Sequence, residues 1–315
     1  MTDLQLTMGI DMPSTPLITK ALAFAKERLK PWGYNHVCRS LHLGFAIADR
    51  LPDLQSRDKE LHAIAALLHD LGWDQSGEFV SPDKRFEVDG AEAARTWVRG
   101  QIAALPGLAT QWSEHRLQLL WDAIALHTSP AIAWYKEAEV KATQLGIFAD
   151  FAGSEGMGMF GFELKAAEWE AICAEFPRSG FKDGVIDTMC GFCRSKPHTT
   201  WDTLMGDFGG EMKVEGYEKE GKRFADLVLH MAEWGSVAEP MLWSAIVVRA
   251  YPAGHSSAES RPSSEDFCVV GCMLMRTCRS FHSLHGCPRL GTDARTHSAF
   301  RYLSHTLPPS PSMNE

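Results

Sequence analysis

The strongest constraint on the fold is a helical spacing of apolar residues that recurs from about residue 15 to about residue 235. Apolar residues three or four positions apart form stripes, as they do on the buried face of an amphipathic helix. The first stripe comprises Leu17, Ala21, Leu22, Ala25 and Leu29. Alternating runs of β-branched residues, which are typical of strands, are missing from the sequence. We therefore predict an all-α fold, a helical bundle.

Capping residues predict where several helices begin. Ser14-Thr15-Pro16 supplies a cap and a helix-starting proline, and Ser113 is placed to cap a later helix. Asp89 and Glu92 have the spacing of a capping box, which predicts a helix start at Asp89. A further amphipathic segment runs over 163–176.

The composition changes near residue 252. All 13 lysines lie at or before Lys222, whereas residues 252–315 are rich in serine and proline. The periodic pattern ends before the same point. We therefore expect one helical domain over 1–251, with a motif core at about 15–155 and further helices to about 235, and a disordered extension over 252–315.

Charge and cysteine usage limit the partners that we expect. The net charge is -9, and residues 1–251 carry 35 acidic and 25 basic side chains. A negative surface is a poor general partner for nucleic acid or anionic lipid. No apolar run reaches the ~18 residues of a membrane helix, and no secretory signal is recognisable. We expect a small-molecule substrate, no nucleic-acid or membrane partner, and a location in the cytoplasm or nucleus; the sequence leaves a homo-oligomer open.

The dipeptide His69-Asp70 is the first candidate for chemistry. It follows the apolar run 65–68 and precedes Leu71 and Gly72, so an imidazole and a carboxylate stand side by side at the end of a buried helix. Burying either group without a partner is costly, and a divalent cation would satisfy both. Alternatively, His69 caps the helix C-terminus and Asp70 faces solvent.

Other polar residues in apolar surroundings favour the metal site. His36 opens the preceding helical segment, 33 residues upstream of His69, and Asp150 lies among apolar neighbours 80 residues after Asp70. His127 shares a helix face with Trp121 and Ile124, so it is expected to point inward if that face packs inward.

The order His, then His-Asp, then Asp on successive helices resembles the HD-domain superfamily of metal-dependent hydrolases. This resemblance covers roughly residues 15–155. It implies that His36, His69, Asp70 and Asp150 are the ligands of one divalent metal ion, with zinc expected first and iron or manganese as alternatives. Their nearest side-chain atoms should converge on one point at roughly 2–2.5 Å.

Longer motifs are similar to the fungal branch of this superfamily that includes cyanamide hydratases, up to about residue 230. They are Tyr34-Asn35-His36-Val37-Cys38-Arg39-Ser40, His69-Asp70-Leu71-Gly72-Trp73-Asp74, Arg85-Phe86-Glu87-Val88-Asp89-Gly90-Ala91, Ala125-Leu126-His127-Thr128-Ser129-Pro130, Lys196-Pro197-His198-Thr199-Thr200-Trp201-Asp202 and Gly206-Asp207-Phe208-Gly209. This similarity implies a hydratase that adds water to a small nitrile, converting cyanamide to urea.

The chemistry of such a site assigns further roles. Two imidazoles and two carboxylates leave a position for water, whose pKa the metal would lower enough to supply hydroxide near neutral pH. Asp70 then counts as catalytic as well as metal-ligating. His127 and Glu87 are the candidates for a proton shuttle or for orienting a ligand, although each is also compatible with a plain structural role. Trp73 and Phe86 are the candidates for the walls of the substrate pocket.

Two alternatives stay open. An HD-type phosphohydrolase acting on a nucleotide or phosphomonoester is the main one, and Arg39 could bind its phosphate or, equally, orient a ligand carboxylate. Against it, Trp73 stands where many phosphate-cleaving relatives carry lysine. The second alternative is a non-catalytic helical protein that keeps a metal site for stability.

Overall fold

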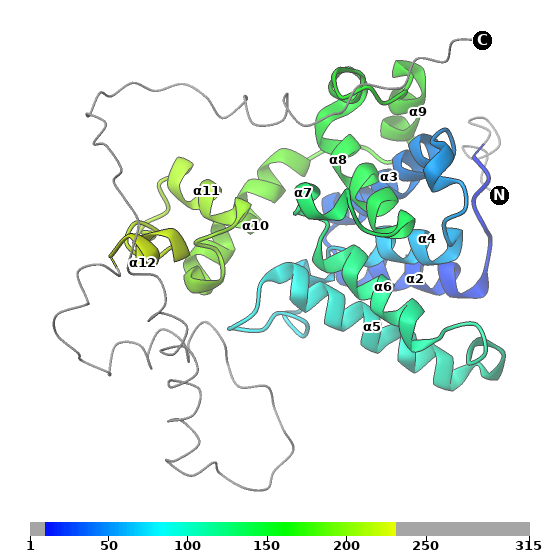
Figure 1. The fold of residues 1–315 in the computed structure, drawn as a ribbon, viewed down its shortest axis with the longest axis horizontal. Helices are drawn as coiled ribbons and strands as arrows, with labels where there is room; N and C mark the ends of the chain where they lie inside the picture. The colour runs from blue at the N-terminus through cyan, green and yellow to red at the C-terminus, as the bar shows by residue number, and fades with distance from the viewer. Residues whose placement is uncertain (1–9, 231–315) are drawn as a thin grey trace, which may run out of the picture. The chain divides into compact units, whose positions relative to one another are not determined.

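The computed structural model describes residues 10–230, and every regular element within them is helical. These residues form eleven α-helices and four short 3-10 helices and contain no strand, which confirms the predicted all-α class. Figure 1 shows their arrangement. The α-helices are α2 Pro16–Arg28, α3 Pro31–Ala48, α4 Lys59–Leu68, α5 Phe86–Ala104, α6 Glu114–Ala125, α7 Pro130–Ala133, α8 Ala138–Met159, α9 Ala166–Glu175, α10 Phe181–Ser195, α11 Leu204–Glu211 and α12 Phe224–His230. The 3-10 helices are η1 Pro52–Leu54, η2 Leu71–Trp73, η3 Pro106–Leu108 and η4 Pro197–Thr199.

Two predicted helix starts are confirmed at atomic detail. The hydroxyl of Thr15 accepts a hydrogen bond from the backbone N–H of Ile18 at 3.2 Å, directly before Pro16 begins α2. Ser113 caps α6 in the same way, accepting from the backbone N–H three residues further on. Each cap satisfies one of the amide groups that a helix N-terminus leaves without an intrahelical partner.

The predicted helix start at Asp89 is wrong by one turn. Helix α5 begins at Phe86, after Arg85 in an extended conformation. The Asp89 carboxylate does not cap the helix, because its Oδ2 accepts from the ammonium of Lys196 at 2.7 Å and from the backbone N–H of Ser81 at 3.1 Å. A long-range ion pair has therefore taken the side chain that the sequence pattern assigned to a local cap.

Helix α4 is enclosed by its neighbours. Every residue from Leu61 to Leu68 is buried, and the helix packs against α2, α3, α5, α6 and α8. Alanine and leucine, which dominate this segment, are good helix formers with no polar group to satisfy. Because α4 ends inside the protein, the two residues that follow it, His69 and Asp70, are buried as well.

Helices α3 and α8 touch at the level of their backbones. A Cβ placed on Gly146 in α8 would lie 2.3 Å from the carbonyl oxygen of Ser40 and 2.7 Å from the Cα of Gly44. His36 lies two turns before Gly44 in α3, and Asp150 lies one turn after Gly146 in α8. The antiparallel crossing at the two glycines therefore brings His36 and Asp150 together.

A second close approach positions the turn after His69-Asp70. A Cβ on Gly72, within η2, would lie 2.1 Å from the carbonyl oxygen of Phe86, at the start of α5. Only glycine fits such a contact without a backbone shift. The aromatic side chains of Trp73 and Phe86 consequently lie side by side, with ring centroids 5.8 Å apart.

Helix α10 joins the later helices to this core. Its apolar side chains pack with Phe86 in one cluster; they are Phe181, Val185, Met189 and Phe192, and Met205 of α11 completes the cluster. The buried ion pair between Lys196 and Asp89 links the end of α10 to α5. A buried charge pair of this kind is costly to break from one side, so it favours this packing of α10.

The described helices run to His230, whereas the predicted boundary near residue 251 and the predicted disorder of 252–315 lie outside the described residues. Both stay predictions. None of the helices in the described part of the chain is long and apolar enough to cross a membrane.

The contact between α3 and α8 leads to a stability prediction. We expect Gly146→Ala to lower the free energy of unfolding by roughly 1–3 kcal/mol, because the added methyl group has no space between two backbones. Gly100→Ala is the matched control, since nothing lies within 4 Å of a Cβ at this position in α5; it should stabilise by roughly 0.5–1 kcal/mol. Urea unfolding of both variants measures the difference, and equal effects would contradict the packing.

His62 is a fully buried histidine on α4 that lies away from the candidate site. Its Nδ1 accepts a hydrogen bond from Nε of Arg57 at 3.0 Å, and its ring stacks on Phe45 with a centroid separation of 4.6 Å. Burial, reinforced by the positive charge of Arg57, lowers the pKa of His62 well below its ordinary value. The folded protein therefore keeps this imidazole neutral, while the unfolded chain protonates it below about pH 6.5.

This difference predicts how stability depends on pH. A histidine with a lowered folded pKa contributes stability above the unfolded pKa and loses it as the pH falls below about 6.5. We expect His62→Gln to flatten the dependence of unfolding free energy on pH between 6.5 and 5.5, by up to about 1.4 kcal/mol per pH unit, the value for one proton. Urea titrations with a metal chelator present measure the slope. An unchanged slope would show that His62 is not held neutral.

Candidate metal centre

His69 and Asp70 follow α4 directly and lie inside the protein. The Nδ1–H of His69 donates to the carbonyl oxygen of Ala66 at 2.9 Å. This hydrogen bond places a proton on Nδ1 and leaves Nε2 as the nitrogen that could bind a metal ion. That Nε2 lies 3.1 Å from Oδ2 of Asp70, so the free side of the imidazole faces the carboxylate.

His36 brings a second imidazole to the same point from α3. Its Nε2 lies 3.3 Å from Nε2 of His69 and 3.6 Å from Oδ2 of Asp70. The other ring nitrogen, Nδ1, donates to Oδ2 of Asp150 at 2.7 Å. Burial lowers the pKa of His36 despite this carboxylate, so the ring is neutral and its Nε2 also carries a lone pair.

These three side chains fit a divalent metal ion. One donor atom from each lies within 4.8 Å of the other two, and all three residues are buried. Both carboxylate oxygens of Asp70 are buried without a hydrogen-bond partner among the described residues. The neighbouring imidazoles outweigh burial and lower the pKa of Asp70, so its carboxylate keeps a negative charge that a cation between the three side chains would bind. The imidazole and carboxylate donors suit zinc, iron or manganese.

Asp150 is not a member of this group in the structure. Its carboxylate lies on the Nδ1 side of His36 and is held there by the guanidinium of Arg39, with Nε 2.8 Å from Oδ1 and NH2 2.9 Å from Oδ2. The expected convergence of four donor atoms is therefore seen for three of them. Direct ligation by Asp150 stays a prediction, and in the described arrangement Asp150 fixes the tautomer and orientation of His36 instead.

The charge of Asp150 is strongly stabilised. Burial by itself would raise the pKa of this carboxyl, but the hydrogen bond from His36 and the guanidinium of Arg39 outweigh burial and lower the pKa to about 2. Arg39 itself is fully buried, and its NH1 donates to the carbonyl oxygens of Phe176 and Pro177. Of the two roles considered for Arg39, the structure shows the one of orienting a carboxylate.

His127 lies next to the three candidate ligands. Its Nδ1–H donates to the carbonyl oxygen of Ile124 at 2.6 Å, and its Nε2 lies 3.8 Å from Oδ1 of Asp70. Burial and the neighbouring His69 lower the pKa of His127 to about 4. The ring is therefore neutral at physiological pH and directs a lone pair towards Asp70, a geometry that suits proton transfer; the role itself stays a prediction.

Glu87 is buried, and it is connected to the site through Thr128, the residue after His127. Its Oε1 accepts from the hydroxyl of Thr128 and from NH2 of Arg85, both at 2.5 Å. Thr128 follows His127 in the chain, so Glu87 is placed behind His127. The hydrogen bonds of Glu87 go to Arg85 and Thr128 and not to His36, His69 or Asp70, and its role in proton transfer stays a prediction.

Aromatic rings enclose the imidazole of His36. Trp73 stacks on it at 6.0 Å, Phe181 at 4.8 Å, and Phe151 meets it edge-on at 5.3 Å between centroids. Phe151 is 51% exposed, so the aromatic surroundings extend from the buried donors to the surface. The imidazole of His36 is thus surrounded by aromatic rings where it does not contact Asp150 or the other donor groups.

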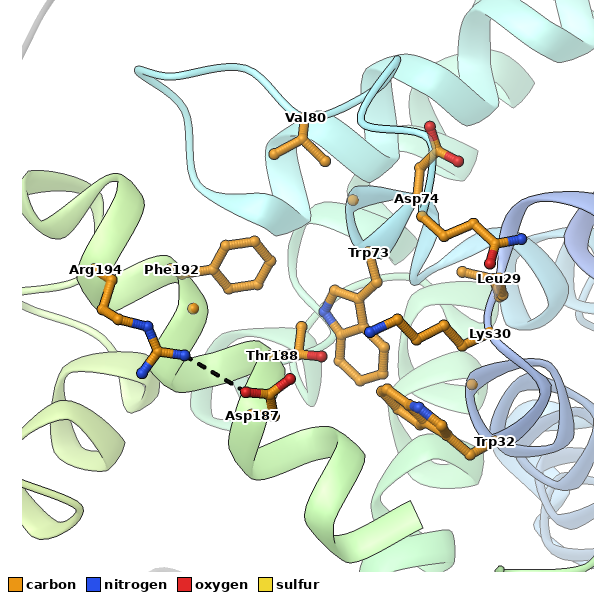
Figure 2. A pocket seen from close by; sticks show the side chains of 14 residues that line it. Leu29, Lys30, Trp32, Trp73, Asp74, Val80, Asp187, Thr188, Phe192 and Arg194 are labelled. Atoms are coloured by element: carbon orange, nitrogen blue, oxygen red, sulfur yellow. Dashed lines mark hydrogen bonds and ion pairs between the residues drawn. The ribbon is translucent and has the colours of Figure 1, made fainter. Parts of the chain in front are cut away.

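A cavity of about 300 Å³ lies beside the site, and Trp73 forms part of its wall. Figure 2 shows Trp73 in this wall with Trp32 next to it, and the ion pair of Arg194 and Asp187 at another side. Phe86, the second predicted wall residue, does not line this cavity, although it contacts Trp73 and the ring of His127. Trp73 therefore contacts both the cavity and the imidazole of His36.

Three residues near the site carried no signal in the sequence that we used. Phe151 directly follows Asp150 in the chain, and this adjacency was the one sequence feature that could have indicated that Phe151 lies near the site. Arg178 and Phe181 lie at the junction of α9 and α10, beyond the motif core, where no motif or spacing points to a site. Arg178 donates through NH1 to Oδ1 of Asp150, so this later segment contacts the candidate site directly.

Comparison with known proteins supports this interpretation of the geometry. Residues 33–145 match the family model for the HD domain. The matched segment contains His36, His69, Asp70 and His127, whereas Asp150 follows its end. Proteins with this domain are in general metal-dependent hydrolases, in agreement with the buried His-His-Asp group. A search of curated proteins found no match.

The orphaned carboxylate predicts an unusual mutational effect. Asp70→Asn should abolish stabilisation by Zn²⁺, which in the wild-type protein should reach about 2.7 kcal/mol at one hundred times the dissociation constant. With chelator present, the same variant should lower the unfolding temperature only slightly, because no hydrogen bond of the Asp70 carboxylate is lost.

Asp89→Asn provides the matched control for that experiment. Asp89 is equally buried but is paired with Lys196, so its substitution should destabilise the protein with and without metal. Thermal unfolding with Zn²⁺ and with chelator separates the two behaviours. Equal Zn²⁺ stabilisation of Asp70→Asn and the wild type would exclude Asp70 as a ligand.

Proposed function

We propose that this chain, whose residues 33–145 match the family model for the HD domain, is a metal-dependent hydratase that adds water to a small nitrile, with cyanamide as the first substrate to test. The coarser activity, metal-dependent hydrolytic chemistry, is supported by the domain and by the buried His-His-Asp group. The choice of a nitrile rests on the surroundings of that group.

The choice of an uncharged nitrile over a phosphate ester rests on the arginines and lysine near His36, His69 and Asp70, because their charges are already paired. Among the described residues, the cations that contact the carboxylates in and behind the site are each paired: Arg39 and Arg178 with Asp150, Arg85 with Glu87, and Lys196 with Asp89. Phosphate recognition typically uses an arginine or lysine that is free to bind it. The aromatic rings around His36 favour a small uncharged substrate instead.

His36, His69 and Asp70 would hold the ion, with Asp150 as the further predicted ligand. When bound, the ion would supply an activated water molecule and a positive charge that stabilises developing negative charge. Water adds across the triple bond: its oxygen bonds to the nitrile carbon, and its protons end on the nitrogen, so that cyanamide gives urea.

The protein supplies the path for the protons. The lone pair on Nε2 of His127 accepts a proton from water and returns it to the nitrile nitrogen, because the hydrogen bond to Ile124 keeps Nδ1 protonated throughout. A pKa of about 4 makes His127 a weak base that gives up the proton readily. The buried Glu87, behind Thr128, holds negative charge near the imidazolium that forms transiently.

A second candidate function is an HD-type phosphohydrolase. The observation in its favour is Lys30, which lines the cavity beside Trp73 and has no carboxylate partner among the described residues. A phosphate bound there would have one ammonium group to neutralise it. A non-catalytic protein that binds a metal for stability is the third candidate.

One assay separates the three. The protein is loaded with Zn²⁺, Fe²⁺ or Mn²⁺ and incubated with cyanamide and, in parallel, with a panel of nucleotides and phosphomonoesters. We expect urea from cyanamide, no phosphate release, and at least a 100-fold lower rate for His127→Gln, in line with the loss of a general base. Phosphate release without urea would support the phosphohydrolase, and neither product from metal-loaded protein would support the non-catalytic alternative.

A further inference from the structure

Arg178 links the segment after α9 to the carboxylate that orients His36. Its NH1 donates both to Oδ1 of Asp150 and, at 2.5 Å, to the main-chain carbonyl oxygen of the same residue. The guanidinium also lies over the rings of Phe181 and Trp169, 4.8 Å and 5.5 Å from their centroids. Arg178 thus contacts α8, α9 and α10 at once, and it lies outside the matched segment 33–145.

Neutralising charge does not explain this contact. Arg39 already forms a two-pronged pair with Asp150, and His36 donates to the same carboxylate. A second guanidinium adds a positive charge that one carboxylate does not need. The additional bond to the main-chain carbonyl indicates that Arg178 acts on the position of Asp150.

The backbone of α8 near Asp150 explains why these contacts from Arg178 are needed. Helix α8 is interrupted at Gly153, whose φ of 69° and ψ of 178° are not helical. Such a break leaves carbonyl groups of the preceding turn without regular intrahelical donors, as at a helix C-terminus. Asp150 lies in that turn, and Arg178 donates to its carbonyl. The residue that orients His36 therefore stands on a helix end that Arg178 holds in place.

We propose that Arg178 is a positioning residue of the metal centre. By fixing both the backbone and the carboxylate of Asp150, it keeps Oδ2 against Nδ1–H of His36. That contact holds the tautomer in which Nε2 of His36 faces His69 and Asp70. The segment after the matched HD domain is consequently part of the site. This inference rests on the metal-binding half of the proposed function and does not depend on the substrate.

The test compares two arginines of similar exposure. Arg178 and Arg50 have 31% and 27% of their side chains exposed, and both tie the region of α9 to a neighbouring helix, Arg50 through Glu168 at 2.5 Å. Only Arg178 reaches the site. The variants are Arg178→Ala, Arg178→Lys and the control Arg50→Ala, each prepared as the full chain.

Two readouts distinguish positioning from stability alone. The dissociation constants for Zn²⁺ and Co²⁺ are measured by competition with a chelating dye, and the visible absorption of the Co²⁺ form reports the ligand geometry. We expect Arg178→Ala to weaken binding of both ions about 10- to 100-fold and to change the Co²⁺ bands. Arg178→Lys should recover part of the affinity, while Arg50→Ala should lower only the unfolding temperature.

The other possible results distinguish an error in the role of Arg178 from an error in the proposed function. If Arg178→Ala binds both ions as tightly as Arg50→Ala and keeps the wild-type Co²⁺ spectrum, the positioning role is wrong. If the wild-type protein binds neither ion, this inference fails together with the proposed metal centre. If the wild type binds metal with the expected dependence on Arg178 but produces no urea, the inference holds and the proposed hydratase function fails.

Discussion

The structure depends on one buried group of donor atoms: the carboxylate of Asp70, without a hydrogen-bond partner in the described part of the chain, faces the imidazoles of His36 and His69. Asp70, His69 and His36 are each held in this arrangement by bonds on their far sides or by the chain itself. The Nδ1–H of His69 is held by a carbonyl of α4, and that of His36 by Asp150. These outer hydrogen bonds orient the remaining nitrogen of each imidazole towards Asp70, as the outer partners of metal-binding histidines do.

The packing of the helices makes this arrangement possible. The glycine contact between α3 and α8 lets His36 approach Asp150, and the contact at Gly72 brings the start of α5 against the turn that follows Asp70. Burial of α4 among its neighbouring helices places the dipeptide at its end inside the protein. Each close approach depends on a missing side chain, so the site is sensitive to substitutions that lie well away from the donor atoms.

Sequence patterns predicted those parts that depend on local spacing. The apolar period predicted the helices, and the run before His69 predicted that the dipeptide ends a buried helix. The resemblance to HD domains placed His36 and His69 together, as the structure does. The orientation of Asp150 was not predictable in the same way, because it depends on arginines from two distant segments. The predicted cap at Asp89 was wrong for a similar reason: the Asp89 carboxylate binds a lysine 107 residues away instead of capping a helix.

The most direct test is the position of the ion itself. Crystals of the Zn²⁺-loaded protein, measured on both sides of the zinc absorption edge, should show one anomalous peak about 2–2.3 Å from Nε2 of His36, Nε2 of His69 and a carboxylate oxygen of Asp70. The same map would show which side of His36 the carboxylate of Asp150 occupies. Absence of a peak at these three atoms, or a zinc ion bound only elsewhere, would contradict the metal centre on which the proposed function depends.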